Sequence, residues 1–214
     1  IMIFNCVILA RKNSKRIINK NLSNFKGKPL IYWTLKQSLK LKRVKKIIVS
    51  SDSEKIRNFS TKFSKKFLID NRPTKLALSS TKSESVLKYL IKKYKISKKQ
   101  YILLLQPTSP LRNQRDIHQM LYYAKKYKLN SIHSVSNYLG KTAIKKKINI
   151  LNKKKFLKIK DLSFNGNIYL FKVNLLINKN SIYETPQNVY ITKKKYSLDI
   201  DNYSDLKING SKQN

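Results

Sequence analysis

The sequence predicts an α/β fold, in which a mostly parallel central sheet is covered by helices on both faces. Continuous apolar runs such as Phe4–Leu9 and Tyr101–Leu105 are typical of strands that are buried on both faces. Segments with apolar residues at helical spacing alternate with these runs, which is the pattern of parallel strands joined by helices. The chain has 214 residues, 41% of them hydrophobic, which suits a single domain with its own core.

The predicted strands are short apolar segments bounded by polar or turn-forming residues. In chain order they are Phe4–Leu9, Lys46–Ser50, Phe67–Ile69, Tyr101–Leu105, Ser131–Val135, Asn167–Phe171 and Tyr196–Ile200. Asn137–Leu162 breaks the alternation, because it is lysine-rich and only weakly patterned. We expect strands or a hairpin there, outside the main sheet but within a single domain that spans residues 2–214.

The predicted helices carry apolar residues three and four positions apart. Pro29 suits the first turn of a helix, where the backbone amides have no partners within the helix. In chain order the predicted helices are Pro29–Leu41, Ser53–Phe63, Ser83–Tyr94 and Ile117–Tyr127. Loops are predicted over 11–24, 70–80 and 106–112. Since sheets of this kind bind ligands beyond the carboxyl ends of their strands, we expect the chemistry in these loops.

The net charge is +38, and nucleic-acid binding is the first explanation that such a charge suggests. However, 41 of the 48 basic residues are lysine, 7 are arginine, and they are spread along the whole chain. A dedicated nucleic-acid site is typically clustered and richer in arginine. Lysine, asparagine and isoleucine have AT-rich codons, so we attribute the charge to base composition. We expect no dedicated nucleic-acid partner, and a basic nucleic-acid-binding protein stays the alternative.

Several features of the sequence argue against a disulfide-rich protein, a cysteine or histidine metal site, and a secreted or membrane protein. Cys6 is the single cysteine, so no disulfide framework or cysteine metal site is predicted. His118 and His133 lack the spacing of a ligand pair. The apolar segment 1–10 is followed rather than preceded by positive charge, and it is too short to span a membrane. These features predict a cytoplasmic protein with no membrane partner.

The loop after the first strand carries cations at the end of the sheet where a ligand is expected. Arg11, Lys15 and Lys20, with the Ser14 hydroxyl and the loop amides, suit a polyphosphate. The loop is no Walker motif, because glycine occurs only at positions 27, 140, 166 and 210. A solvated, lysine-rich surface loop is the alternative interpretation.

Three of the ten acidic residues fall within the seven positions 199–205. On a strand, Asp199 and Asp201 would project from one face, where two carboxylates repel unless a cation lies between them. Mg²⁺ is commonly held by one or two carboxylates together with substrate phosphates. An aspartate that caps the following helix would explain one of the pair instead.

Other polar residues after predicted strands are further candidates. Gln106 can donate and accept at a ligand, although an ordinary strand-to-helix connection explains it as well. Asp52 either contacts a nucleotide or caps the helix beside it. Arg72 could reach a phosphate or carboxylate, and Asn165-Gly166 resembles a tight turn that lets a ligand approach the backbone.

Taken together, these motifs resemble the acylneuraminate cytidylyltransferase family, the CMP-sialic acid synthetases. The family loop A-R-x-G-S-K-x-x-x-x-K-N corresponds to residues 10–21, and the family run L-L-Q-P-T-S-P-L-R is intact at Leu104–Arg112. The family run S-[IV]-D-I-D-x-x-x-D-[FLW] corresponds to Ser197–Leu206. Shorter matches, in family order, lie at Gly27–Leu30, Val49–Asp52, Arg72-Pro73 and Asn165–Tyr169.

The resemblance implies a Rossmann-like nucleotidyltransferase fold with a small protruding dimerisation segment, here 137–162, that can complete the sugar site of the partner. It implies transfer of CMP from CTP to the anomeric hydroxyl of a nine-carbon 2-keto acid sugar of the sialic, legionaminic or pseudaminic acid type. Pyrophosphate is released, and the product serves surface glycan synthesis. The expected partners are CTP, the acidic sugar and a second copy of the chain. The expected cofactor is Mg²⁺ or Mn²⁺.

The resemblance also implies a role for each matched residue. Lys20, Arg11 and Asp201 form the expected catalytic set, with Lys20 neutralising the leaving pyrophosphate. Asp199 and Asp201 hold the metal, and one of them helps to deprotonate the attacking hydroxyl. The residues that match substrate-binding positions are Arg11, Ser14, Lys15, Lys20, Asn21, Arg72, Ser83, Gln106 and Asn165.

Three departures from the family pattern bear on activity. Asn13 stands where the family has glycine, and asparagine is among the few other residues that tolerate a left-handed backbone. The run 78–83 lacks the family's aspartate, and no arginine shortly precedes Asn165. Weaker sugar binding, a different sugar or a catalytically inactive homologue would each account for these departures.

Overall fold

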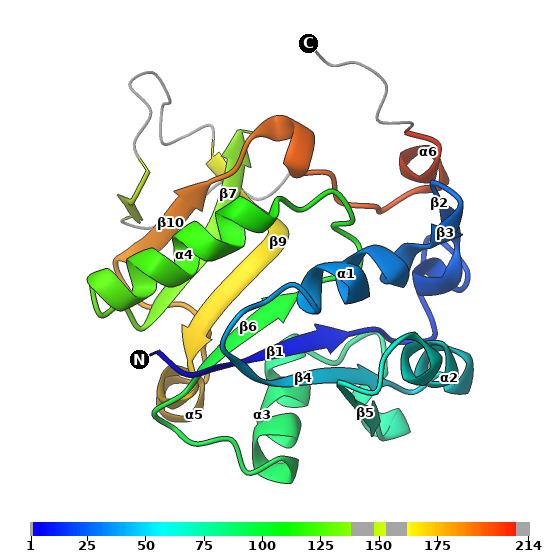
Figure 1. Cartoon of the computed structure of the whole chain (residues 1–214), viewed down its shortest axis with the longest axis horizontal. Helices are drawn as coiled ribbons and strands as arrows, with labels where there is room; N and C mark the ends of the chain where they lie inside the picture. Colours follow the sequence, from blue (N-terminus) through cyan, green and yellow to red (C-terminus); the bar gives the residue numbers. More distant parts are fainter. Residues whose placement is uncertain (1, 138–147, 153–161, 209–214) are drawn as a thin grey trace.

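A central sheet with the strand order β5-β4-β1-β6-β9-β7-β10-β8 organises the computed structural model (Figure 1). The structure describes residues 2–137, 148–152 and 162–208. The strands of this sheet are β1 (Phe4–Leu9), β4 (Val44–Ser51), β5 (Phe67–Asn71), β6 (Tyr101–Leu105), β7 (Ser131–Asn137), β8 (Ile148–Ile150), β9 (Leu162–Lys172) and β10 (Gln187–Ile191). Among the described strands of this sheet, β9 alone runs antiparallel to its neighbours, so the predicted, mostly parallel sheet is confirmed.

Helices cover both faces of the sheet, as predicted (Figure 1). One core cluster joins the sheet to α1 (Leu30–Ser38), α2 (Glu54–Phe63) and α4 (Gln114–Lys126). The other joins it to α3 (Ser83–Lys93) and α5 (Val173–Lys179). Side chains along a strand point alternately to its two faces, so neighbouring residues of β1 enter opposite clusters. This double burial explains why β1 and β6 have continuous apolar sequences.

Several predicted boundaries move by a few residues. Asp70 and Asn71 belong to β5 rather than to a loop, and α1 ends at Ser38 rather than at residue 41. The helix α4 begins at Gln114, three residues earlier than predicted, because the Asn113 side chain accepts a hydrogen bond from the backbone amide of Arg115 at 3.0 Å. The helix α5 and the strand β10 were not predicted.

The predicted insert at 137–162 lies mostly outside the described residues. Its described part includes β8, which pairs in parallel with β10 at the edge of the main sheet. The prediction that strands of this segment lie outside the main sheet is therefore wrong for β8. Gln187 and Val189 of β10 face Ile148 and Ile150 in this register.

A short hairpin closes the long polar loop and leads into α1. It consists of β2 (Asn24–Phe25) and β3 (Lys28–Pro29), with Lys26 at φ 52° and Gly27 at φ 77° between them. Two left-handed residues at the turn are typical of the tight hairpin connection whose twist matches that of the strands, and glycine is well suited to it. The hairpin places Phe25 in a small apolar cluster beside the loop that follows β1.

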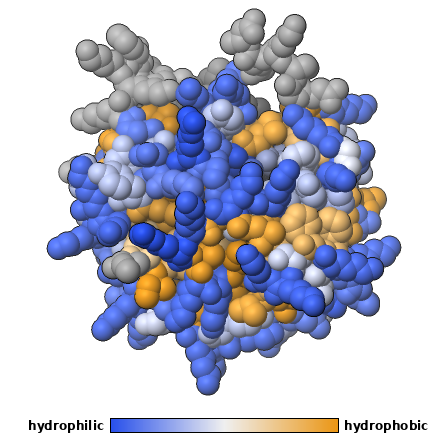
Figure 2. All heavy atoms as spheres, viewed as in Figure 1, coloured by the Kyte–Doolittle hydropathy of each residue, from blue (hydrophilic) through white to orange (hydrophobic). Residues whose placement is uncertain are grey.

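The surface carries hydrophilic side chains on all sides of the view in Figure 2, with apolar areas between them. Hydrophilic side chains are therefore spread over the visible face rather than confined to one part of it. Within the described residues, no helix is long and apolar enough to cross a membrane.

His133 on β7 predicts a pH-dependent stability. The side chain is fully buried, its ring lies 4.5 Å from that of Tyr183 between centroids, and its Nε2 contacts the carbonyl oxygen of Ile182 at 3.0 Å. Burial lowers the pKa of His133 from 6.5 to about 3. The neutral ring therefore favours the folded state above pH 6.5, and this stability is lost as the pH falls from 6.5 towards 3.

We expect the melting temperature of the wild-type chain to fall by roughly 5 °C more than that of His133→Phe between about pH 6.5 and pH 5. This difference corresponds to about 2 kcal/mol. Circular dichroism melts at both pH values measure it. Equal declines for the two proteins would contradict the assignment.

Candidate active site

A cleft of about 370 Å³ opens at the carboxyl ends of β1, β5 and β6. Leu9 ends β1, Arg72 follows β5, and Gln106 follows β6. Residues predicted from separate motifs line this cleft, namely Arg11, Ser14, Lys20, Asn21, Arg72, Ser83, Gln106, Asp199 and Asp201. Lys15 instead lines an adjoining hollow of about 270 Å³, which shares Ser14 with the cleft.

The loop after β1 is fixed to the protein at its start. The Asn21 side chain donates from Nδ2 to the carbonyl oxygen of Arg11 at 2.9 Å. The Asp52 carboxylate accepts from the backbone amide of Lys12 at 2.7 Å, whereas Ser53 caps α2. Asp52 therefore shapes the loop instead of capping the helix. Asn13 is not among the described residues with a positive φ, so its position does not need the left-handed backbone that we expected asparagine to tolerate.

Lys20 reaches the cleft from a nearly buried position, with 8% of its surface exposed. Its Nζ donates to the carbonyl oxygen of Ile200 at 2.8 Å and lies 3.4 Å from Oδ1 of Asp201. Arg16 contacts the other oxygen of Asp201, with Nη1 3.1 Å from Oδ2. Ion pairs thus connect the loop after β1 to the acidic segment 199–205 at the cleft.

The acidic segment is not a strand, so the geometric premise for Asp199 and Asp201 is wrong. Residues 197–201 have no regular secondary structure, and the Ile200 amide donates to the carbonyl oxygen of Thr108 at 2.8 Å. The Ile200 side chain is fully buried in the apolar cluster that contains Phe25. Both aspartates nevertheless line the cleft, so anchoring of Ile200 replaces a strand ladder in placing them.

Helix capping in this segment belongs to another aspartate. Asp205 accepts at Oδ2 from the backbone amides of Asp201 and Asn202, at 2.8 Å each. Together with Asn202 it forms a capping box for α6 (Tyr203–Leu206). Asp205 therefore takes the capping role that was the alternative explanation for Asp199 or Asp201. Both of these carboxylates remain candidates for the ligand site.

Gly166 has a backbone conformation, at φ 70°, that side chains other than glycine rarely adopt. A β-carbon at this position would lie 3.3 Å from Oε1 of Gln106 and 3.8 Å from Oδ2 of Asp199. Gly166 lies within β9, so the predicted tight turn is wrong, and two side chains of the cleft approach its backbone closely.

Asn165, a predicted substrate contact, has a different role in the structure. It is 3% exposed, its Oδ1 accepts from the Ser134 hydroxyl at 2.7 Å, and its Nδ2 donates to the Thr192 hydroxyl at 2.7 Å. These contacts brace β9 against β7 and the segment after β10, so the side chain is not presented to the cleft.

Ser83 lies at the rim of the cleft, where it is the first residue of α3. The residue before it, Lys82, makes no side-chain cap to the helix. The first amides of a helix lack partners within the helix, so an uncapped start at the rim offers hydrogen-bond donors to a ligand.

Arg112 supports the site and was not predicted to do so. Its guanidinium is 4% exposed and donates to the carbonyl oxygens of Asn167 and Gln106 at 2.7 Å each, and to the Gln37 side chain at 2.7 Å. Burial lowers the pKa of Arg112 to about 9. The arginine holds the backbone of Gln106 in place. Arginine is rare in this chain, and this rarity was the sequence signal available.

Positive and negative groups face one another across the cleft. Arg11, Lys20 and Arg72 supply the positive charge, and Asp199 and Asp201 the negative charge. No group of three or more histidine, cysteine, aspartate or glutamate side chains suited to a metal occurs in the described part of the chain. A metal in this cleft would therefore rely on the two aspartates and on ligand oxygens.

A comparison with known protein families shows to which family this chain belongs. A family model described as cytidylyltransferase matches residues 5–203, which is nearly the whole chain. The chain belongs to the cytidylyltransferase family. The resemblance inferred from the sequence motifs is thereby confirmed.

Relatives and solved structures agree with this family. An N-acylneuraminate cytidylyltransferase from Escherichia coli is 27% identical over 94% of this chain and 50% of its own length. A pseudaminic acid cytidylyltransferase from Campylobacter jejuni is 32% identical over 53% of this chain and 50% of its own length. The chain spans about half the length of the N-acylneuraminate cytidylyltransferases that it matches. The structure of a CMP:2-keto-3-deoxy-manno-octonic acid synthetase complexed with CTP shares the fold, with a TM-score of 0.68, 16% identity and 95% of both chains covered.

Proposed function

We propose that this member of the cytidylyltransferase family transfers CMP from CTP to the anomeric hydroxyl of a nine-carbon 2-keto acid sugar. The observation that carries the proposal is that one cleft brings together cations of the loop after β1 and the two aspartates. A triphosphate needs the cations, and a divalent metal needs the carboxylates. The names of the E. coli and C. jejuni relatives support an acidic nine-carbon sugar as the acceptor.

Different residues of the cleft suit different parts of the nucleotide. Arg11, Ser14 and Lys20 suit the phosphates, because they offer positive charge and a hydroxyl. Arg72 and Ser83 stand among the apolar side chains of Leu76, Leu78 and Val86, which also line the cleft. An apolar wall with a few placed donors suits a base, and cytosine offers acceptors at O2 and N3. We place Gln106 on the sugar side.

The reaction forms one bond and breaks one bond at the α-phosphorus. The anomeric oxygen of the sugar attacks the α-phosphorus, the bond to the β-phosphate oxygen breaks, and pyrophosphate leaves. The hydroxyl proton passes to a carboxylate of the aspartate pair. Catalysis of such a transfer is mostly positioning and charge neutralisation, and Lys20 faces the charge that develops on the leaving group.

The aspartate pair fits a divalent cation by its chemistry. Hard cations prefer carboxylate oxygens. Both oxygens of Asp201 contact cationic groups, so a metal would share this carboxylate with Arg16 and Lys20. In our proposal Asp199 and Asp201 hold Mg²⁺ or Mn²⁺. A bound metal would neutralise charge on the phosphates as the transfer proceeds.

The homodimer implied by the resemblance and the cytoplasmic location predicted from the sequence are part of the same proposal. Light scattering of the purified chain tests the dimer, with a truncation of 138–147 as the variant. A monomer at all accessible concentrations would contradict it.

We expect CTP to be preferred over UTP, ATP and GTP by at least about a hundredfold in kcat/KM. Uracil carries a hydrogen-bond donor at N3, where cytosine carries an acceptor, so the Arg72 guanidinium would face a donor. Pyrophosphate release with each triphosphate, and with sialic, legionaminic and pseudaminic acid in turn, measures the preference and identifies the sugar. Equal rates with UTP would contradict the cytidylyl assignment. No turnover with any pair would favour an inactive homologue.

A further inference from the structure

Arg72 is held in the cleft by the residue at the end of a neighbouring strand. Its Nε donates to the Ser50 hydroxyl at 3.0 Å, and its Nη2 donates to the Ser50 carbonyl oxygen at 2.6 Å. The side chain is 5% exposed and lines the cleft. Within the described residues, Nη1 has no hydrogen-bond partner, so this nitrogen is left for a ligand.

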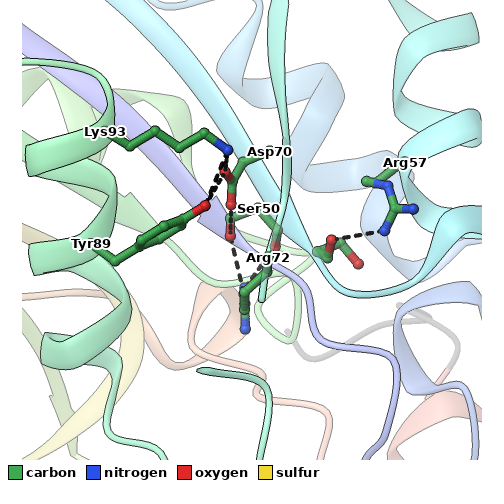
Figure 3. Close-up of polar contacts among 7 residues, drawn as sticks. Ser50, Arg57, Asp70, Arg72, Tyr89 and Lys93 are labelled. Atoms are coloured by element: carbon green, nitrogen blue, oxygen red, sulfur yellow. Dashed lines mark hydrogen bonds and ion pairs between the residues drawn. The ribbon is translucent and has the colours of Figure 1, made fainter. Parts of the chain in front are cut away.

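The Ser50 hydroxyl links Arg72 to a buried carboxylate (Figure 3). Ser50 donates its single proton to Oδ2 of Asp70 at 2.7 Å and is fully buried. A hydroxyl has one proton, so donation to Asp70 turns its lone pairs towards the arginine. Ser50 and Asp70 are direct cross-strand partners in the β4–β5 register, and Arg72 follows Asp70 by two residues. Strand geometry therefore brings the three side chains to one side of the sheet.

Asp70 is fully buried, and a buried carboxylate needs partners. On its far side, Oδ1 accepts from Lys93 Nζ at 2.7 Å and from the Tyr89 hydroxyl at 3.3 Å, both on α3. Lys93 also donates to the Tyr89 hydroxyl at 3.1 Å. The hydrogen bond to Asp70 raises the pKa of Lys93, so this end of the network stays charged. The carboxylate is thus fixed from α3 and presents its other oxygen to Ser50.

We propose that Asp70 and Ser50 are positioning residues of the nucleotide cleft. Asp70 orients the Ser50 hydroxyl, and Ser50 holds two nitrogens of Arg72 so that the third faces the nucleotide. The inference rests on the proposed function, because it assumes that Arg72 contacts CTP. It assigns a role in nucleotide affinity to two buried residues that touch no ligand.

A neighbouring arginine shows that an arginine can bind the backbone of β4 without a chain of hydrogen bonds like that of Arg72, Ser50 and Asp70. Arg57 on α2 donates from Nη1 to the carbonyl oxygen of Ser51 at 3.2 Å, on the other side of β4 in Figure 3. It makes a similar backbone contact one residue further along the strand, but among the described residues no serine hydroxyl or buried carboxylate orients it. The hydrogen-bond chain from Asp70 through Ser50 is therefore specific to the arginine that lines the cleft.

The test compares Ser50→Ala with Ser50→Thr and with Ser60→Ala. Ser60 is a matched control, since it is fully buried and its hydroxyl donates to the Ile56 carbonyl oxygen at 2.9 Å within α2. We expect Ser50→Ala to raise the dissociation constant of CTP, measured by calorimetry on the full chain, by about tenfold. KM for CTP should rise with kcat little changed, because lost ground-state binding acts on KM. Ser50→Thr should restore binding to within about threefold, and Ser60→Ala should bind as wild type.

A second measurement separates failure of this inference from failure of the proposed function. The Nε–H proton of Arg72 should exchange slowly in a ¹⁵N NMR spectrum without nucleotide, and Ser50→Ala and Asp70→Asn should both speed its exchange. If the wild-type chain binds no CTP, the proposed function fails while this signal still reports the positioning. If Ser50→Ala lowers the melting temperature but keeps both the CTP affinity and the slow Nε–H signal, the network is purely structural and the inference is overturned.

Discussion

Lys20→Met should lower turnover at saturating CTP by at least about a hundredfold while the chain remains folded. A hundredfold loss corresponds to about 2.7 kcal/mol of transition-state stabilisation, which is the scale of one charged contact to a developing charge. The Lys20 ammonium is nearly buried and is aimed by the Ile200 carbonyl oxygen and Asp201, so no flexible surface lysine can replace it. Methionine keeps the length of the apolar stem and removes the charge.

The loss of Lys20 also has a structural cost that must be separated from catalysis. The carbonyl oxygen of Ile200 loses its donor, and Asp201 keeps Arg16 as a partner. We expect a destabilisation of about 1–3 kcal/mol, small enough for the protein to fold. Lys28→Met is the matched control, since it removes one charge from an exposed hairpin residue outside the cleft. Single-turnover pyrophosphate release and urea unfolding measure the two effects. A wild-type rate at saturating CTP would exclude Lys20 from the leaving-group site.

The sequence predicted best those elements whose burial is complete and continuous. Tyr101–Leu105 is apolar at every position and was predicted with its observed bounds. The strand β10 is as fully buried, but it begins with Gln187 and Asn188. The Asn188 amide is satisfied by the Ser131 carbonyl oxygen at 3.1 Å and by Glu184 at 2.7 Å. The Ser131 partner lies 57 residues away and cannot be inferred from a local pattern, so the polar start of the strand hid its burial.

For the segment around Ile200, the sequence predicted correctly which side chains share a side, although the predicted strand is not present. Leu198 and Ile200 alternate with polar residues, as they would on a strand, and this alternation predicted which side chains share a side. The structure produces the same separation with an anchored loop, because Ile200 enters a small apolar cluster. Alternation reports burial of every second residue, and it does not by itself report a ladder of hydrogen bonds.

The residues of the site divide in a similar way. Most of the predicted site residues that line the cleft lie in the segments after β1, β5 and β6 and before α6, and their roles at a ligand stay predictions. Arg112, Ser50 and Asp70 act through contacts to distant partners, such as Ser50 to Asp70, 20 residues away, and Arg112 to Asn167, 55 residues away. Their roles depend on tertiary packing, so spacing gave no signal, and composition gave only the rarity of arginine. Asn165 was predicted to contact substrate, and the structure shows its side chain as a buried brace between β9, β7 and the segment after β10.

Asp199→Asn and Asp201→Asn should each lower the rate by at least about tenfold, which corresponds to about 1.4 kcal/mol of transition-state stabilisation. Asparagine keeps the size of the side chain and removes one charge, so the change acts on metal affinity and on the proton acceptor. We expect the Mg²⁺ concentration needed for half-maximal rate to rise for both variants, because the cation loses half of its carboxylate charge. Asp116→Asn is the matched control, since Asp116 accepts a hydrogen bond from Tyr190 at 3.1 Å and lies outside the cleft.

The metal-free stability of the two variants should differ, and this difference follows from the contacts of Asp201. Its carboxylate lies between Arg16 and Lys20, so Asp201→Asn leaves the nearly buried Lys20 ammonium with less opposing charge and should lower the melting temperature. Asp199→Asn removes a negative charge that repels Asp201, but this charge also favours the charged form of the buried Arg112, so the two effects oppose each other and the melting temperature should change less. Rates against Mg²⁺ concentration and melting curves without metal measure both effects. If both variants keep the wild-type rate and the wild-type Mg²⁺ dependence, the pair only holds the loop after β1 in place, and the metal site must be sought elsewhere.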